Sequence, residues 1–201
     1  SVPGVISFAK PEPFDYTWEY FEKMCVNPND EVVVESSLNY ADDLYFLRED
    51  KDHRIKKGNE GIKVFNKGKA RGEIVAGNLQ TLLVLNDTKY LPDMNGKILF
   101  VEEDETSTPA HVDRFLCQCK QLGWFQKIAG LVFGRFTEQS QFSAEDPFED
   151  LLKEYLSGVS IPILYNADFG HSDPMITIPN GGICLIDDEQ ITLNKAVSEH
   201  L

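Results

Sequence analysis

The stretch KILFVEEDE, residues 97–105, decides how the middle of this sequence folds. Its first five residues are almost continuously apolar, a pattern typical of a strand buried on both faces of a sheet. Two further strands are predicted downstream, in AGLVFGRF at 129–136 and in IPILY at 161–165. The first of the three strands ends in an acidic cluster that begins with Glu102.

Start and stop signals place helices between these strands. Thr108 can cap a helix that begins at Pro109, and Gly123 can end it. A second helix is expected over residues 146–156. The order strand–helix–strand–helix–strand favours parallel strands with helices that cover the sheet.

Shorter segments flank this centre. Strands are expected at 4–8 and 31–35, at 62–65 and 73–75 around a turn at 66–68, and in a β-meander over 175–193. A helix is expected from Asp15 to Met24, and Asn78 can cap another helix. The polar segment 40–61 is predicted to be an exposed, mobile loop. The fold class is therefore mixed α/β, with β-hairpins beside the central strands.

Composition excludes some classes of function. The chain has 33 acidic and 19 basic residues, a net charge of −14, so nucleic acid and anionic lipid are poor partners. No apolar run approaches the roughly 20 residues that span a bilayer. No signal peptide is apparent at the N-terminus. The four cysteines are expected to be reduced and mostly buried, which fits a cytoplasmic protein.

Two strand ends carry residues suited to catalysis. KILFV ends at Glu102, and IPILY leads into NADFGHSD, which contains His171. Loops that follow parallel strands open at the same edge of a sheet. A carboxylate there can orient an imidazole, which can then accept a proton from a nucleophile. A lone loop histidine can also be structural, and the acidic run can also favour the N-terminus of the next helix.

The nucleophile for such a pair is not evident. No G-x-S-x-G motif occurs, and Ser36, Ser37 and Ser172 do not lie on a sharp strand-to-helix turn. Two alternatives stay open. One is a metal-dependent hydrolase whose ligands are Glu102, Asp104, His171 and Asp173. The other is a binding module without catalysis.

Several stretches together resemble one family of serine peptidases. They are GVISFAKP near the start, GEIVAGNLQTLL, YLPDMNGKILFVEEDE with HVDRFLCQ behind it, and PILYNADFGHSDPMITIPNGG. Their order and spacing are similar to those of the C-terminal domain of the LD-carboxypeptidases, especially the branch that includes the microcin C immunity peptidases.

The resemblance implies a two-domain hydrolase with a Ser–Glu–His triad. Residues 1–201 would form the C-terminal domain, of a swivelling β/β/α type, with Glu102 and His171 as its catalytic residues. The serine would belong to an N-terminal domain that this chain lacks, so the chain alone is expected to be inactive. The whole protein would be a cytoplasmic homodimer that needs no metal or cofactor.

The expected substrate is a small peptide or peptide conjugate with a free carboxylate, such as an L,D-linked muropeptide or a microcin-like amide. Asn78, Glu103 and Arg114 are candidates for binding it. Arg114 could instead pair with Asp113 or with the acidic run.

One departure from the family concerns aromatic residues. The segment 40–65 lacks the tryptophans that the microcin peptidases stack on a nucleotide. Tyr45, Phe46 or Phe65 could take that place.

Overall fold

The computed structural model describes residues 3–9, 11–26 and 31–194, in which eight strands form one mixed sheet. Their order across the sheet is β1-β10-β9-β5-β6-β7-β8-β4. The predicted mixed α/β fold is confirmed. No helix among the described residues is long and apolar enough to cross a membrane.

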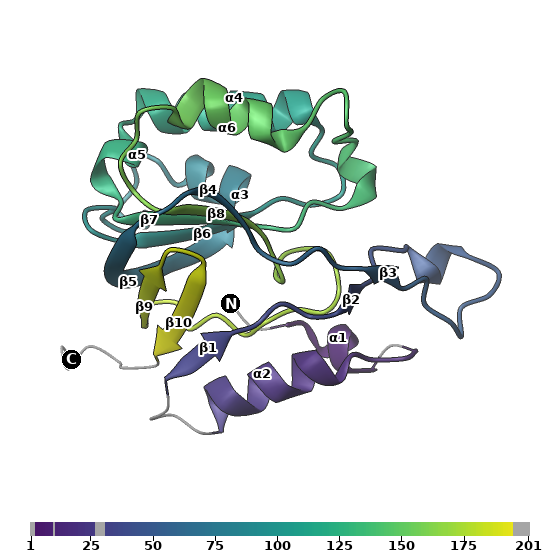
Figure 1. The fold of residues 1–201 in the computed structure, drawn as a ribbon. Coiled ribbons are helices and arrows are strands. Elements are labelled where there is room, and N and C mark those ends of the chain that lie inside the picture. Colours follow the sequence, from purple (N-terminus) through teal and green to yellow (C-terminus); the bar gives the residue numbers. More distant parts are fainter. Residues whose placement is uncertain (1–2, 10, 27–30, 195–201) are drawn as a thin grey trace.

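The four central strands run parallel, as predicted for the last three of them. They are β5 (Lys69–Asn78), β6 (Ile98–Glu102), β7 (Gly130–Gly134) and β8 (Ile163–Ala167). Figure 1 shows helices above one face of these strands. They are α3 (Leu79–Val84), α4 (Pro109–Gln121), α5 (Trp124–Lys127) and α6 (Phe148–Leu156). Leu116, Trp124 and Leu152 are buried there in the first hydrophobic core.

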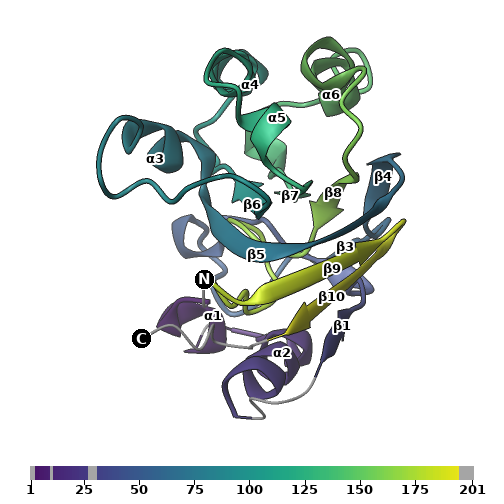
Figure 2. The ribbon, with the colours of Figure 1, turned by 90° about the vertical axis from the view of Figure 1, so that its left-hand side faces the viewer.

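The opposite face is covered by a second layer. The first half of β5 pairs with β9 (Ile183–Asp187). β9 pairs in turn with β10 (Gln190–Asn194), and β10 pairs with β1 (Val32–Val34) at the edge of the sheet. Figure 2 shows β5 as a long, bent strand shared by both parts of the sheet, with α2 (Asp15–Cys25) beneath β1 and β10. Met24, Phe100 and Ile186 belong to the second core.

Three predicted strand features are wrong. The strand expected at 4–8 is replaced by helix α1 (Val5–Ala9), because the short apolar run packs Phe8 against Trp18 of α2, with ring centroids 4.6 Å apart. Periodicity cannot separate strand from helix in so short a run. The strands around the turn at 66–68 do not pair with each other, since β4 (Lys63–Asn66) pairs with β8 instead. In the expected meander, 183–194 form a hairpin, while 175–179 form no strand.

The polar segment 40–61 is more structured than expected. It contains β3 (Lys57–Gly58), paired with β2 (Asn39–Tyr40), and a short 3-10 helix η1 (Tyr45–Leu47). Arg54 is buried within it because two carboxylates, Asp43 and Asp173, receive its guanidinium. The expectation of a wholly exposed loop is therefore wrong at Arg54.

All four cysteines are free thiols. Cys119 and Cys184 are buried, and burial raises the pKa of each thiol to about 12. Cys117 is partly buried, and Cys25 is exposed at the end of α2. The prediction that the cysteines are mostly buried therefore holds for two of them and is wrong for Cys25.

Candidate active site

The carboxyl ends of β5, β6, β7 and β8 meet at one edge of the sheet. Asn78 pairs in register with Glu102 across β5 and β6. The loop that follows β8 returns to this edge and carries His171. Parallel pairing therefore gathers the predicted polar residues at one place, as the sequence indicated.

Glu102 and His171 are in direct contact. His171 Nδ1 lies 2.6 Å from Glu102 Oε2, over a separation of 69 residues. The Glu102 side chain is 13% exposed and that of His171 is 45% exposed. With Nδ1–H donating to the carboxylate, Nε2 of a neutral imidazole keeps its lone pair free to accept a proton.

Two glycines allow this close approach. A Cβ on Gly170, whose φ is +111°, would lie 3.0 Å from Glu102 Cβ. A Cβ on Gly134 at the end of β7 would lie 2.5 Å from the Phe169 carbonyl oxygen. Any larger residue at these positions would push the His171 loop away from Glu102.

The surroundings of His171 favour its charged form. The hydrogen bond to Glu102 raises the pKa of His171 above its usual value of 6.5, although burial acts in the opposite direction. The charges of Glu102, Glu105 and Asp104 add to the increase. A base at this position is therefore neutral only at pH values above its raised pKa.

A cavity of about 510 Å³ opens beside the pair. Glu102 and His171 line it together with Tyr45, Phe46 and Arg54 from the polar segment. Apolar side chains from the loop after β8 also contribute, namely Phe169, Met175, Ile176 and Ile178. A concave site that combines apolar side chains with charged groups beside an imidazole is suited to a small organic ligand.

The predicted substrate-binding residues lie in different settings. Asn78 lines the cavity and caps α3, since its Oδ1 accepts from Thr81 N at 3.0 Å. Glu103 is buried and accepts from Gln80 N and Ser107 Oγ, both at 2.7 Å. Glu103 therefore holds the start of α3 and the loop before α4 together, and it does not line the cavity.

Arg114 lies on the outer side of α4 and does not line the cavity. Its Nε donates to the Ala110 carbonyl oxygen at 2.9 Å, one turn earlier in the same helix. Asp113, its alternative partner, instead accepts from Tyr155 Oη at 2.6 Å. The structure therefore does not bring Arg114 together with Glu102 and His171.

The serines considered from sequence face other partners. Ser36 Oγ accepts from Ile62 N at 3.0 Å, and Ser172 Oγ accepts from Arg135 at 3.2 Å. Ser37 Oγ donates to the Asn39 carbonyl oxygen. Ser7 of α1 does line the cavity. Sequence reasoning missed Ser7 because it treated residues 4–8 as a strand.

Two of the four ligands proposed for the metal-dependent alternative, Asp104 and Asp173, form hydrogen bonds with other protein groups. Asp104 accepts from Thr106 N and Thr106 Oγ1 at 2.8 and 2.6 Å. Asp173 accepts from Arg54 at 3.1 Å. Within the described part of the chain, no three His, Cys, Asp or Glu side chains converge as metal ligands.

Other residues near the site were not predicted. Arg54 and Asp173 form a buried ion pair at the cavity, and Arg135 forms another with Asp168 at the end of β8. The sequence gave no signal that Arg54 is buried, because one of its partners, Asp173, lies 119 residues away. Of the three aromatic candidates, Tyr45 and Phe46 line the cavity, whereas Phe65 packs against the first core.

Comparisons with known proteins found a matching family and similar sequences. Residues 71–186, more than half of the chain, match the family described as LD-carboxypeptidase C-terminal domain. A putative carboxypeptidase of Bacillus subtilis, YocD, is 35% identical, with 100% of this chain and 60% of that protein covered. The microcin C7 self-immunity protein MccF of Escherichia coli is 30% identical, with 98% of this chain and 57% of that protein covered.

Solved structures show the same fold. A MccF-like protein from Bacillus anthracis is similar with a TM-score of 0.87 and 33% identity, over 96% of this chain and 60% of that one. The microcin C7 self immunity protein in complex with aspartyl sulfamoyl adenosine is similar with a TM-score of 0.82 and 25% identity, over 98% and 60% of the two chains. This chain thus spans about 60% of the length of these proteins.

Proposed function

The chain belongs to the LD-carboxypeptidase family, and we propose that it supplies the glutamate–histidine half of a serine peptidase active site. The observation that carries the proposal is the 2.6 Å contact between His171 Nδ1 and Glu102 Oε2. The pair lies beside a cavity at the carboxyl edge of parallel strands, where open α/β sheets place their active sites.

In the proposed reaction, His171 Nε2 accepts the proton of a serine hydroxyl as the serine oxygen attacks an amide carbonyl. Glu102 holds the imidazole in the tautomer that leaves Nε2 free, and it offsets the charge of the imidazolium. His171 then donates the proton to the leaving nitrogen. Water, deprotonated by the same imidazole, releases the acyl group and restores the serine.

We assign the serine to a part of the longer protein outside this chain. Ser36, Ser37 and Ser172, the candidates from the sequence, have their hydroxyls in hydrogen bonds with other groups. Ser7 is the alternative within the chain, because it lines the cavity. The isolated 201-residue chain should therefore hydrolyse no substrate, whereas the whole protein should.

The proposed substrate is a small peptide or peptide conjugate that fits a cavity of about 510 Å³. Two chemistries are compatible with the relatives. One is the L,D-linked peptide that the family description indicates. The other is an aminoacyl nucleoside conjugate such as the aspartyl sulfamoyl adenosine bound by the microcin C7 self immunity protein. Tyr45 and Phe46 supply aromatic surface for the second type of substrate.

Hydrolysis by the whole protein tests the proposal. Release of the C-terminal amino acid from an L,D-linked muropeptide and of aspartate from aspartyl sulfamoyl adenosine would both be followed. His171→Gln should lower kcat by at least about a thousandfold, since it removes the base. His111→Gln, on the exposed side of α4, is the matched control and should retain activity.

Two results would contradict the proposal. One is a His171→Gln variant as active as the control. The other is activity that disappears with EDTA and returns with zinc, which would favour the metal-dependent alternative.

A further inference from the structure

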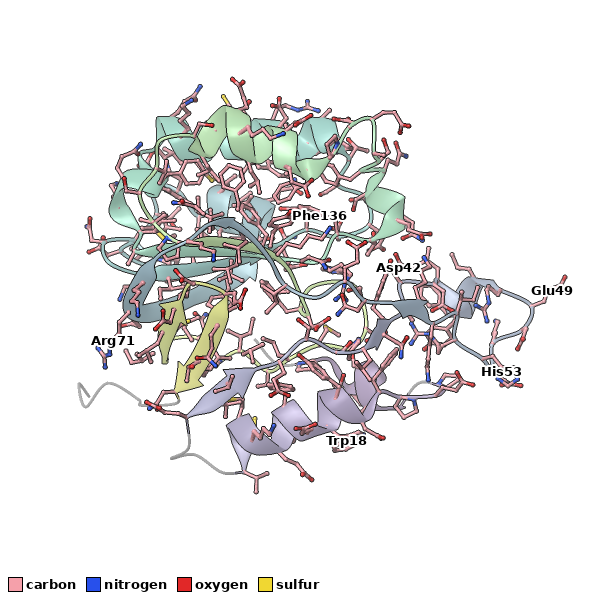
Figure 3. All side chains as sticks on the ribbon, viewed as in Figure 1. Trp18, Asp42, Glu49, His53, Arg71 and Phe136 are labelled. Carbon is pink, nitrogen blue, oxygen red and sulfur yellow. The ribbon has the colours of Figure 1, made fainter. Side chains whose placement is uncertain are left out.

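One side of the cavity is a protruding segment, residues 41–55, which we call the cavity wall. Figure 3 shows the wall extending from the body, with Asp42 near its base and Glu49 and His53 near its far end. Tyr45 and Phe46 of the wall line the cavity, with their rings in an edge-to-face contact at 5.7 Å. The wall therefore supplies part of the surface that a ligand in the cavity would contact.

Arg54 connects the wall to the loop that carries His171. Its Nε donates to Asp43 Oδ1 at 2.8 Å, and its Nη1 donates to Asp173 Oδ2 at 3.1 Å. The guanidinium also stacks on the Tyr45 ring, 4.9 Å from the centroid. The Arg54 side chain is only 2% exposed, so these contacts are shielded from water and salt.

A backbone bridge reinforces the same junction. Ala41 N donates to the Asp173 carbonyl oxygen at 2.7 Å, and Asp173 N donates to the Ala41 carbonyl oxygen at 2.8 Å. Burial acts to raise the pKa of Asp43, but the hydrogen bonds from Arg54 and Ile55 N outweigh it and keep the pKa below its usual value of 3.8. Asp43 is therefore ionised at neutral pH and pairs fully with Arg54.

The His171 loop has other anchors. Arg135 donates to Ser172 Oγ at 3.2 Å, and Ile176 N donates to the Asp168 carbonyl oxygen at 2.8 Å. The base of the wall is held at Asp42, whose carboxylate accepts from Glu138 N and from Lys57 Nζ, both at 2.8 Å, and Arg54 is the buried link between the part beyond it and the His171 loop. The contact of His53 with Glu12, at 3.1 Å near the far end of the wall, is by contrast exposed to solvent. Exposed ion pairs contribute little to stability.

We propose that Arg54 is a positioning residue that holds Tyr45 and Phe46 against the substrate by tying the cavity wall to Asp173. The part of this proposal that concerns substrate rests on the proposed function. The part that concerns the wall does not rest on it. The contacts of Arg54 with Asp43 and Asp173, which we call the clamp, are present in the chain without any substrate. The geometry of a planar guanidinium that joins two carboxylates and a ring is specific to arginine.

The first test measures the clamp in the 201-residue chain by amide hydrogen exchange. Arg54→Met should speed exchange at Ala41 N and Asp173 N at least about tenfold, because the wall opens locally. Arg48→Met is the matched control: Arg48 also pairs with Asp43, at 2.6 Å, but its hydrogen bonds are to the wall itself. The control should change these two rates less than twofold. Equal rates in both variants would overturn the clamp.

If Arg54→Met fails to fold, as judged by circular dichroism, Arg54→Lys takes its place. Lysine keeps the charge but cannot hold both carboxylates and the ring, so exchange at Ala41 N and Asp173 N should still increase. Unchanged protection in the lysine variant would contradict a role specific to arginine.

The second test uses the whole protein and separates KM from kcat. With a peptide substrate, Arg54→Met should raise KM about tenfold and leave kcat within about twofold, because the Glu102–His171 pair stays in place. With p-nitrophenyl acetate, whose acetyl group offers no peptide chain for the wall to hold, kcat/KM should change less than twofold. A loss of kcat on both substrates would instead mean that Arg54 supports the catalytic pair. If the wild-type protein were inactive on both substrates, the proposed function would be rejected. The amide exchange rates of Ala41 and Asp173 would still show whether Arg54 holds the wall.

Discussion

At the scale of single residues, the Glu102–His171 pair is the feature on which the proposed chemistry depends. The sequence brought attention to both residues through their places at strand ends. It contained no information on the tautomer, which follows from the contact between Nδ1 and Oε2. It also gave no account of why Gly134 and Gly170 lack side chains, which the close approach of Glu102 explains.

Replacing the carboxylate should change the titration of the imidazole. The hydrogen bond with Glu102 is the largest cause of the raised pKa of His171, so Glu102→Gln should lower that pKa toward 6.5. An NMR titration of the His171 ring protons measures it. Glu105→Gln is the control, since Glu105 acts on His171 through its charge without a hydrogen bond. The control should produce the smaller decrease, and the reverse order would contradict the pairing.

The same pKa makes stability depend on pH. A folded-state pKa above the unfolded value means that protonated His171 stabilises the fold below about pH 6.5. This contribution is lost as pH rises through the raised pKa. The free energy of unfolding of the wild type, relative to His171→Gln, should therefore be larger at pH 5.5 than at pH 9 in urea titrations. A difference that grows with pH would contradict the raised pKa.

Gly170 should tolerate no side chain. Gly170→Ala forces a residue into φ +111° and places its Cβ 3.0 Å from Glu102 Cβ, so we expect a loss of about 2 to 4 kcal/mol in the free energy of unfolding. Gly158→Ala is the control, because Gly158 has φ +85° but open space around its Cβ position. The control should lose about 1 to 2 kcal/mol. Urea denaturation measures the free energy of unfolding of both variants. A smaller loss for Gly170→Ala than for Gly158→Ala would contradict the crowding against Glu102.

At the scale of elements, the central strands and the helices between them could be predicted because their signals are local. Buried strands read as apolar runs, and Thr108, Pro109 and Gly123 mark the limits of α4. Strand pairing could not be predicted. The turn at 66–68 reads as a hairpin, but β4 pairs with β8 because long-range packing decides which strands become neighbours.

The two faces of α4 should differ in their response to substitution. Leu116 is buried under the helix, so Leu116→Ala should lower the free energy of unfolding by about 2 to 5 kcal/mol. Arg114 is exposed, and its Nε donates to the Ala110 carbonyl oxygen of the same helix. Arg114→Ala should therefore change the free energy of unfolding by at most about 0.5 kcal/mol. Thermal or urea denaturation of both variants measures the difference. If Arg114→Ala raised KM of the whole protein without affecting stability, the residue would have to reach the substrate after all.

At the scale of the whole molecule, one buried ion pair connects segments far apart in the chain. Arg135 at the end of β7 pairs with Asp168 at the end of β8, and Asp168 also accepts from Ser37 N at 2.8 Å. The Arg135 guanidinium stacks on Tyr40, 4.5 Å from the ring centroid. The sequence did not reveal this network, because its members are separated by about 30 to 130 residues and none forms a motif.

Breaking this pair should be costly. Arg135→Met leaves Asp168 buried without its cation, so we expect a loss of about 3 to 5 kcal/mol in the free energy of unfolding. Adding Asp168→Asn removes the uncompensated charge and should recover part of the loss. A double variant that is no more stable than Arg135→Met alone, in urea denaturation, would argue that the charge of Asp168 is not the cause.

In the proposed reaction, Glu102 and His171 of this chain act on a serine held elsewhere in the longer protein. Labelling of the whole protein with a serine-directed fluorophosphonate, followed by mapping of the adduct by mass spectrometry, tests it most directly. We predict one labelled serine outside these 201 residues, with labelling abolished in His171→Gln. An adduct on Ser7, which lines the cavity, or labelling that is as fast in His171→Gln as in the wild type, would contradict the account.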